Sequence, residues 1–183
     1  MADALRERIM NYMDRCPVCT IATVGVDGQP DVATVYFKRK GLDVYFRTGG
    51  SSQKVQNILA NPRVAIAMQE DAPVPRASLE IKGIQSVGTA GVLADGDTAG
   101  VPRAVISRHN AFNRTRSESS VVVKVTLAEI SLIDYSLGLQ HRDQIRPQSG
   151  TDVHHSVDAA TILRYPRLIT PIVTVSGLDA GLG

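Results

Sequence analysis

The chain has 183 residues, of which 43% are hydrophobic and 21% charged, enough apolar material for one globular domain. Its formal net charge of +2 is too small for a dedicated nucleic-acid-binding protein. No apolar run reaches the roughly 18–20 residues of a membrane span, and two cysteines exclude a disulfide-rich scaffold. The polar N-terminal segment lacks the apolar centre of a signal peptide, so we expect a cytoplasmic protein that binds neither nucleic acid nor membrane.

The first predicted element is a helix over residues 3–15, because apolar residues recur at spacings of three and four from Leu5 to Met13. Pro17 prevents its continuation. The Asp27-Gly28 pair then predicts a hairpin turn. Segments rich in β-branched residues predict six strands, at 18–26, 31–38, 42–47, 63–69, 78–92 and 120–135.

A short helix is predicted at 52–60, after the third strand, with Val55, Ile58 and Leu59 as its buried stripe. A weaker helical pattern covers 97–110. Because strands dominate and do not alternate regularly with helices, the pattern favours a mostly antiparallel barrel or sandwich.

Two regions differ in character. We expect a domain over residues 1–139 and a loop-rich C-terminal extension over 140–183, with at most one edge strand or a dimer-contact arm. The segment 141–158 is polar and loop-like. The segment 162–177 is the candidate for the strand, and its prolines confine it to a sheet edge.

Residues 45–54 combine the end of a strand, a Gly49-Gly50 pair and the start of a helix. A helix N-terminus leaves backbone N–H groups unpaired and carries partial positive charge, so it is a ready anion site. Further donors are present in Arg47, Thr48, Ser51, Ser52 and Lys54. An ordinary helix capped by one of the two serines accounts for the same residues. The segment alone therefore leaves a helix cap and a phosphate site as alternatives, and it is neither a P-loop nor a Rossmann fingerprint.

The order of these motifs resembles the FMN-binding core of the pyridoxamine 5'-phosphate oxidase-like superfamily. That family has a Thr at the end of the third strand, a Ser and a basic residue shortly after it, and an Asn-Pro pair closing the helix. The matching residues here are Thr48, Ser52, Lys54 and Asn61-Pro62. Upstream, the strand at 20–24, the Asp27-Gly28 turn, Pro30, the strand at 32–37 and, further on, Gly83 also match. The resemblance covers about residues 5–135.

The resemblance implies a mainly β (α+β) fold, a six-stranded antiparallel split β-barrel with a few short flanking helices. It also implies a homodimer with the flavin at the subunit interface. The residues expected at the FMN phosphate are Thr48, Ser52 and Lys54, with Arg47, Ser51 and Gln53 as further candidates. Ala33, Thr34 and Val35 are expected along the isoalloxazine edge, mostly through backbone groups. Gln85 is either a contact to the flavin of the partner subunit or an exposed strand residue.

The resemblance implies an FMN-dependent oxidoreductase that moves electrons between NAD(P)H or a small-molecule donor and an acceptor. The sequence identifies no catalytic acid or base. Alternatives are a non-catalytic flavin-binding, sensor or stress-type protein, a haem-binding split barrel, and F420 in place of FMN. Ala33 stands where the oxidases proper have an Arg, so the chain looks more like the general-stress-type relatives.

Three other groups have simpler interpretations. Cys16 and Cys19 follow a helix C-terminus, where the helix dipole disfavours a thiolate, so we interpret them as small buried residues rather than a redox pair or metal site. An arginine-rich stretch, 103–116, is either a solvated face or a contact to a phosphorylated substrate or NADPH. The histidines at 141, 154 and 155 are haem or metal candidates only if the extension folds back onto the domain.

Overall fold

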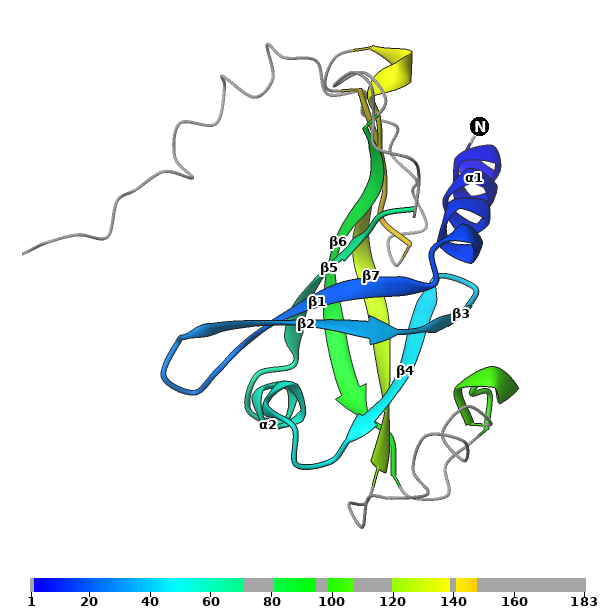
Figure 1. Cartoon of the computed structure of the whole chain (residues 1–183). Coiled ribbons are helices and arrows are strands. Elements are labelled where there is room, and N and C mark those ends of the chain that lie inside the picture. Colours follow the sequence, from blue (N-terminus) through cyan, green and yellow to red (C-terminus); the bar gives the residue numbers. More distant parts are fainter. Residues whose placement is uncertain (1, 71–80, 95–98, 107–119, 139–140, 148–183) are drawn as a thin grey trace, which may run out of the picture.

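The computed structural model describes residues 2–70, 81–94, 99–106, 120–138 and 141–147. Figure 1 shows a curved sheet with one labelled helix near each end. In chain order the elements are α1 (Ala2–Arg15), β1 (Val18–Val24), β2 (Pro30–Tyr36), β3 (Lys38–Lys40), β4 (Asp43–Gly49), α2 (Gln53–Ala60), β5 (Arg63–Met68), β6 (Lys82–Val92), β7 (Ser120–Asp134), the 3-10 turn η2 (Tyr135–Leu137) and β8 (Arg142–Ile145).

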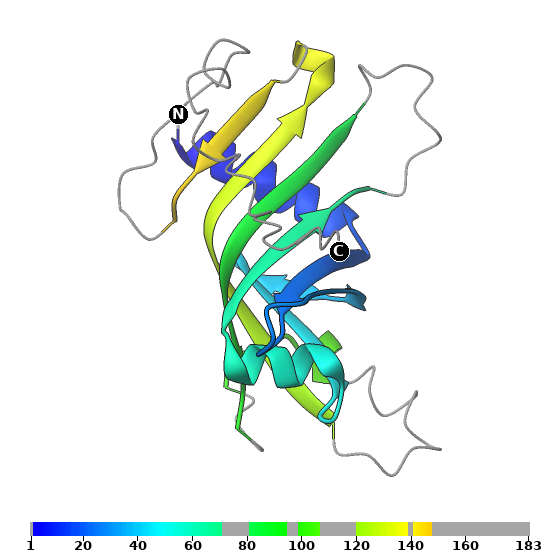
Figure 2. The same ribbon diagram turned by 90° about the vertical axis from the view of Figure 1, so that its left-hand side faces the viewer.

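The strands form one antiparallel sheet in the order β2-β1-β5-β6-β7-β4-β3, with β8 added beside β7. β7 is the longest strand, and β6 pairs along one of its edges. Its other edge is divided, because β4 pairs with residues 120–125 and β8 with residues 130–133. The sheet curls round so that β2 lies beside β4, which gives the split β-barrel that the sequence predicts (Figure 2).

The strand count differs from the predicted six, since the described part of the chain contains eight. β3 is the first addition: it pairs with the start of β4 across a tight turn in which Gly41 has φ of 61°, where the sequence predicted turn alone. β8 is the second, within a segment predicted as loop. Its four residues are too few to reveal their alternation, although Asp143 and Ile145 are buried. The segment 162–177, predicted as a strand, lies outside the described residues.

A β-bulge interrupts the pairing of β6 with β7. The register shifts between Val87 and Gly88, which face Glu129 and Leu127, so Ala128 is the extra residue of a β-bulge. A Cβ at Gly88 would lie only 2.3 Å from the carbonyl oxygen of Thr126. Glycine therefore allows the two backbones to approach closely at the bulge, and the sheet to bend around the core.

The core lies inside the curl and includes the predicted apolar face of α1, from Leu5 to Met13. α1 covers the end of the barrel near β3 and β8, whereas α2 packs against β1, β2 and β6 at the other end (Figures 1 and 2). None of the helices among the described residues has the length and apolar character needed to span a bilayer.

One prediction for α2 is wrong. Val55 and Ile58 are buried as expected, but the side chain of Leu59 is 65% exposed. Asn57 takes its place in the interface and is only 3% exposed. The helix is rotated in this way because Asn57 donates a hydrogen bond to the buried hydroxyl oxygen of Thr23 on β1, at 3.0 Å.

Candidate cofactor site at the start of α2

The turn between β4 and α2 brings together three of the predicted phosphate ligands. The side-chain oxygens of Thr48 and Ser52 lie 3.4 Å apart, and Lys54 Nζ lies 3.4 Å from Thr48 Oγ1. We call these three side chains at the N-terminus of α2 the anion cradle. Ser51 is exposed beside it. Gly49 and Gly50 are not among the described glycines with positive φ, so the backbone turns here without the left-handed conformation.

The geometry of Ser52 distinguishes a helix cap from a ligand-binding residue. Ser52 occupies the N-cap position with extended backbone, but its side chain makes no capping hydrogen bond. No acidic residue lies in the first turn of α2. The hydroxyl of Ser52 is therefore not used as a helix cap, and the first turn has no carboxylate to offset the positive end of the helix.

Gln53 lies in the first turn of α2, next to Lys54. Its Nε2 donates to Asn57 Oδ1 at 2.8 Å, and Asn57 in turn reaches Thr23. Sequence reasoning missed Asn57, because a polar residue within a helix is usually solvated. Helical spacing gave no signal for it, because residues two apart on a helix, such as Val55 and Asn57, do not lie on one face.

Arg47 is placed differently from the other predicted phosphate ligands. Along β4, Val44 and Phe46 face the core, so Arg47 projects from the opposite face of the strand. Its Nε donates to Ser120 Oγ at 2.9 Å, across the β4–β7 pairing. In this structure Arg47 is thus engaged by β7 and makes no hydrogen bond with the cradle side chains.

The three β2 residues predicted to lie along a flavin ring are on an edge strand. Thr34 is exposed, Val35 is buried, and Ala33 packs against the core. They pair with β1 on one side only, and among the described residues no strand pairs with the other side of β2. Alternate backbone N–H and C=O groups of β2 therefore point to an unpaired edge that lies beside β4.

Gln85 lies away from the cradle, on the sheet face opposite the core. There it helps to line a shallow pocket of about 360 Å³. Gln85 Oε1 accepts a hydrogen bond from Arg142 of β8 at 3.1 Å. We call this region the outer face; its lining residues include Thr20, Ala22, Ala65, Ala67, Gln85 and Val87.

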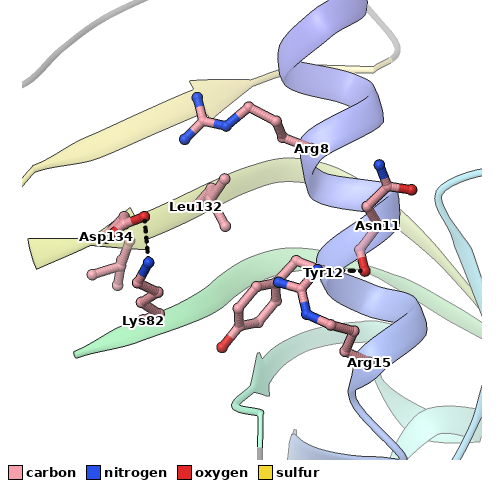
Figure 3. A pocket seen from close by; sticks show the side chains of 8 residues that line it. Arg8, Asn11, Tyr12, Arg15, Lys82, Leu132 and Asp134 are labelled. Atoms are coloured by element: carbon pink, nitrogen blue, oxygen red, sulfur yellow. Dashed lines mark hydrogen bonds and ion pairs between the residues drawn. The ribbon is translucent and has the colours of Figure 1, made fainter. Parts of the chain in front are cut away.

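A second pocket, of about 260 Å³, lies between α1 and the ends of β6 and β7 (Figure 3). It is lined by three cations, but each is held by a carboxylate. The pairs are Arg8–Asp143 at 3.0 Å, Arg15–Glu70 at 3.0 Å and Lys82–Asp134 at 3.2 Å. An anion entering this pocket would have to compete with those carboxylates, so the cradle at the other end of the barrel is the better anion site.

The two cysteines are buried and free. Burial raises the pKa of Cys16 to about 11 and that of Cys19 to about 12. Both are therefore thiols at neutral pH, as expected for structural residues. Within the described ranges no three His, Cys, Asp or Glu side chains gather into a metal site. His141 lies 3.4 Å from Asp143, whereas His109, His154, His155 and most of the 103–116 stretch lie outside those ranges.

Solved structures with the same fold bind different cofactors. A "pyridoxamine 5'-phosphate oxidase-related, FMN binding protein" from Nostoc punctiforme is 13% identical, with a TM-score of 0.60 and coverage of 86% of this chain and 95% of that one. A "heme binding protein" from Mycobacterium smegmatis is 17% identical, with a TM-score of 0.62 and coverage of 77% and 57%. The General Stress Protein 26 from Bacillus anthracis is 20% identical, with a TM-score of 0.53 and coverage of 70% and 93%.

At these identities the structural likeness establishes the fold alone. None of the curated proteins compared with the sequence matches it significantly. The family model described as "Pyridoxamine 5'-phosphate oxidase" matches residues 5–134, which include every strand from β1 to β7 and the whole anion cradle. The chain therefore belongs to the pyridoxamine 5'-phosphate oxidase family.

Proposed function

We propose that this protein binds FMN and transfers electrons between a reduced donor, such as NAD(P)H or a small molecule, and an acceptor. Bound FMN would supply the redox chemistry, whereas the protein would bind the cofactor, orient it and set its electrostatic environment. Family membership supports this proposal, and so does the structural neighbour named as an FMN-binding protein.

The observation that carries the proposal is the convergence of hydrogen-bond donors in the anion cradle. A phosphate monoester carries nearly two negative charges and three acceptor oxygens. The cradle offers it two hydroxyls and the ammonium of Lys54, and the backbone N–H groups of Gln53 and Lys54 lie beside them, with no carboxylate in that turn. Because Ser52 does not cap its own helix, its hydroxyl can bind the phosphate at no cost to α2.

We place the isoalloxazine ring beside the unpaired edge of β2. A flat ring needs small or β-branched neighbours and a few fixed hydrogen bonds for its polar edge. The side chains of Ala33, Thr34 and Val35 are small or β-branched. Their backbone groups that do not pair with β1 supply the hydrogen bonds.

We further propose a homodimer formed through the outer face. The small side chains of that face let a second sheet approach closely, and Val87 is 53% exposed at its centre. Gln85 would then contact the flavin of the partner subunit, with its side chain held by Arg142.

The test is to purify the full chain and record its absorption spectrum with and without added FMN. Bound flavin gives absorption bands at about 375 and 450 nm. Mass spectrometry of the released cofactor distinguishes FMN from F420. Lys54→Glu should abolish FMN binding and leave the thermal midpoint unchanged, because Lys54 interacts with no buried carboxylate in the described structure. If NADPH added under nitrogen bleaches the band at about 450 nm, the protein reduces its flavin, which supports an oxidoreductase over a carrier.

Two results would overturn the proposal. A Soret band in place of the flavin bands would favour haem, which the M. smegmatis neighbour is named for binding. Full FMN affinity in the Lys54→Glu variant would remove the cradle from the site.

A further inference from the structure

Asn57 is a buried polar residue on a helix whose other buried side chains, Val55 and Ile58, are aliphatic. It is 3% exposed, and its partner Thr23 on β1 is 1% exposed. A leucine of similar size would fill the same space without the cost of desolvating an amide. An amide at this position is therefore less favourable than a leucine if packing is its only role.

Both ends of the Asn57 amide have partners, and the partners lie in different parts of the molecule. Nδ2 donates to Thr23 Oγ1 at 3.0 Å, inside the barrel. Oδ1 accepts from Gln53 Nε2 at 2.8 Å, at the surface end of α2. The three side chains thus form a continuous hydrogen-bonded relay from β1 to the first turn of α2, beside Lys54.

We propose that Asn57 is a positioning residue for the anion cradle: the Thr23–Asn57–Gln53 relay fixes α2 against β1 and aims the Gln53 amide at the bound phosphate. This inference rests on the proposed FMN function. Gln53 has a second N–H that its bond to Asn57 does not use, so it can also donate to a phosphate oxygen.

The relay matters because α2 is short. Eight residues with two buried aliphatic side chains leave the helix free to slide or rotate slightly, since hydrophobic contacts are not directional. Hydrogen bonds are directional, and those of Asn57 fix one rotation of the helix. The same rotation exposes Leu59 and keeps Lys54 within reach of Thr48.

The experiment compares the affinities of FMN and riboflavin, which differ only in the phosphate. The ratio of the two dissociation constants isolates the cradle from the ring contacts. We expect the wild-type chain to prefer FMN by more than about tenfold, as hydrogen bonds to a charged group should give. Asn57→Leu should lower this preference about fivefold, the equivalent of one hydrogen bond, and leave riboflavin affinity unchanged.

A second variant separates positioning from stability. Thr23→Val combined with Asn57→Leu removes both polar partners, so much of the thermal stability lost in Asn57→Leu should return. The FMN preference should stay low, because Gln53 still lacks its anchor. Gln53→Ala should lower the preference as much as Asn57→Leu, and the two changes together should lower it no further.

Tyr12→Phe is the matched control. It removes a part-buried hydrogen bond, from Glu70 N to Tyr12 Oη at 3.1 Å, at the opposite end of the barrel. Its FMN preference should equal that of the wild type.

Three results would overturn the relay. The first is an FMN preference in Asn57→Leu equal to that of the wild type, and the second is an equal loss in Tyr12→Phe. The third is a parallel loss of riboflavin affinity in Asn57→Leu. If the wild type binds riboflavin and FMN with equal affinity, the anion cradle does not bind the phosphate, and the proposed role of the relay is overturned with it.

Discussion

Arg142 on β8 donates a hydrogen bond to Gln85 on β6, 3.1 Å away, although β7 lies between the two strands. Gln144 makes a similar contact with Ser131 on β7, and Arg146 pairs with Glu129. β8 is thus joined to the sheet by side chains on the outer face as well as by its backbone. The start of the C-terminal extension is part of the folded barrel.

Replacing Ile145 tests this conclusion. Ile145 is 1% exposed, so Ile145→Ala should lower the free energy of unfolding by about 2–5 kcal/mol through lost burial and a cavity. Arg142→Ala, which removes one exposed hydrogen bond, should cost under about 1 kcal/mol. Chemical denaturation of both variants measures the difference. If Ile145→Ala is as stable as the wild type, β8 does not stabilise the fold.

Ser52→Ala distinguishes a helix cap from a cofactor ligand. Loss of a capping serine costs about 1 kcal/mol of stability. Because Ser52 makes no capping bond, the thermal midpoint should not change. FMN affinity should fall about tenfold, the effect of losing one hydrogen bond to a charged group, as measured by fluorescence titration. A stability loss with unchanged affinity would assign Ser52 to capping.

Gly88→Ala should distort the bulge between β6 and β7. The new Cβ would lie 2.3 Å from Thr126 O and 3.1 Å from Leu127 Cα, both backbone atoms that can move only if the strands separate. We expect a destabilisation of about 1–3 kcal/mol or more, seen as a lower thermal midpoint. Gly91→Ala on the same strand is the control, because a Cβ there has no neighbour within 4 Å. If both variants melt like the wild type, the close approach at Gly88 is not a constraint.

Val87→Arg tests the proposed dimer. A guanidinium at the centre of the outer face would be buried without a partner in the dimer but solvated in the monomer. Light scattering during size exclusion should therefore show a monomer for this variant and a dimer for the wild type. Val26→Arg, at a residue 92% exposed on the β1–β2 turn, should leave the mass unchanged. A Val87→Arg dimer would place the interface elsewhere.

The buried thiols predict a loss of stability at alkaline pH. Burial raises the pKa of Cys16 from 9.0 to about 11 and that of Cys19 from 9.0 to about 12. The unfolded chain therefore loses its thiol protons first as pH rises. The thiols contribute full stability below pH 9.0, and this contribution falls as pH rises from there through the folded pKa values.

Urea unfolding between pH 8 and 11, at about half-unit steps, measures this effect. Each thiol should add up to about 1.4 kcal/mol per pH unit to the slope. A Cys16→Ala, Cys19→Ala double variant should be less stable at about pH 8, where both thiols are uncharged, but should lack this part of the slope. Parallel curves for the two proteins would contradict the assignment.

Sequence patterns predicted those parts of the fold that repeat over many residues. The apolar face of α1 and the long strands β6 and β7 carry enough periodic positions to be recognised. β3 and β8 have three and four residues, too few for a period, and form because longer neighbours offer them an edge. Thr48, Ser52 and Lys54 came from motif order, and they do meet in space.

The wrong burial prediction for Leu59 has a physical cause of the same kind. Leu59 was placed inside because helical spacing fits it as well as it fits Ile58, and hydrophobicity favours burial. The hydrogen bond from Asn57 to Thr23, 34 residues apart in sequence, decides the rotation instead. Contacts of this range cannot be read from a local pattern.

The divided edge of β7 has a consequence for how such a protein can change. The half that pairs with β4 supports the strand that leads into the anion cradle, and the half that pairs with β8 holds residues 142–145 in the sheet. Insertions or replacements after the second half need not disturb the first, because the two partners never share a backbone hydrogen bond. A single strand thus lets the C-terminal region diversify while the anion cradle keeps its geometry.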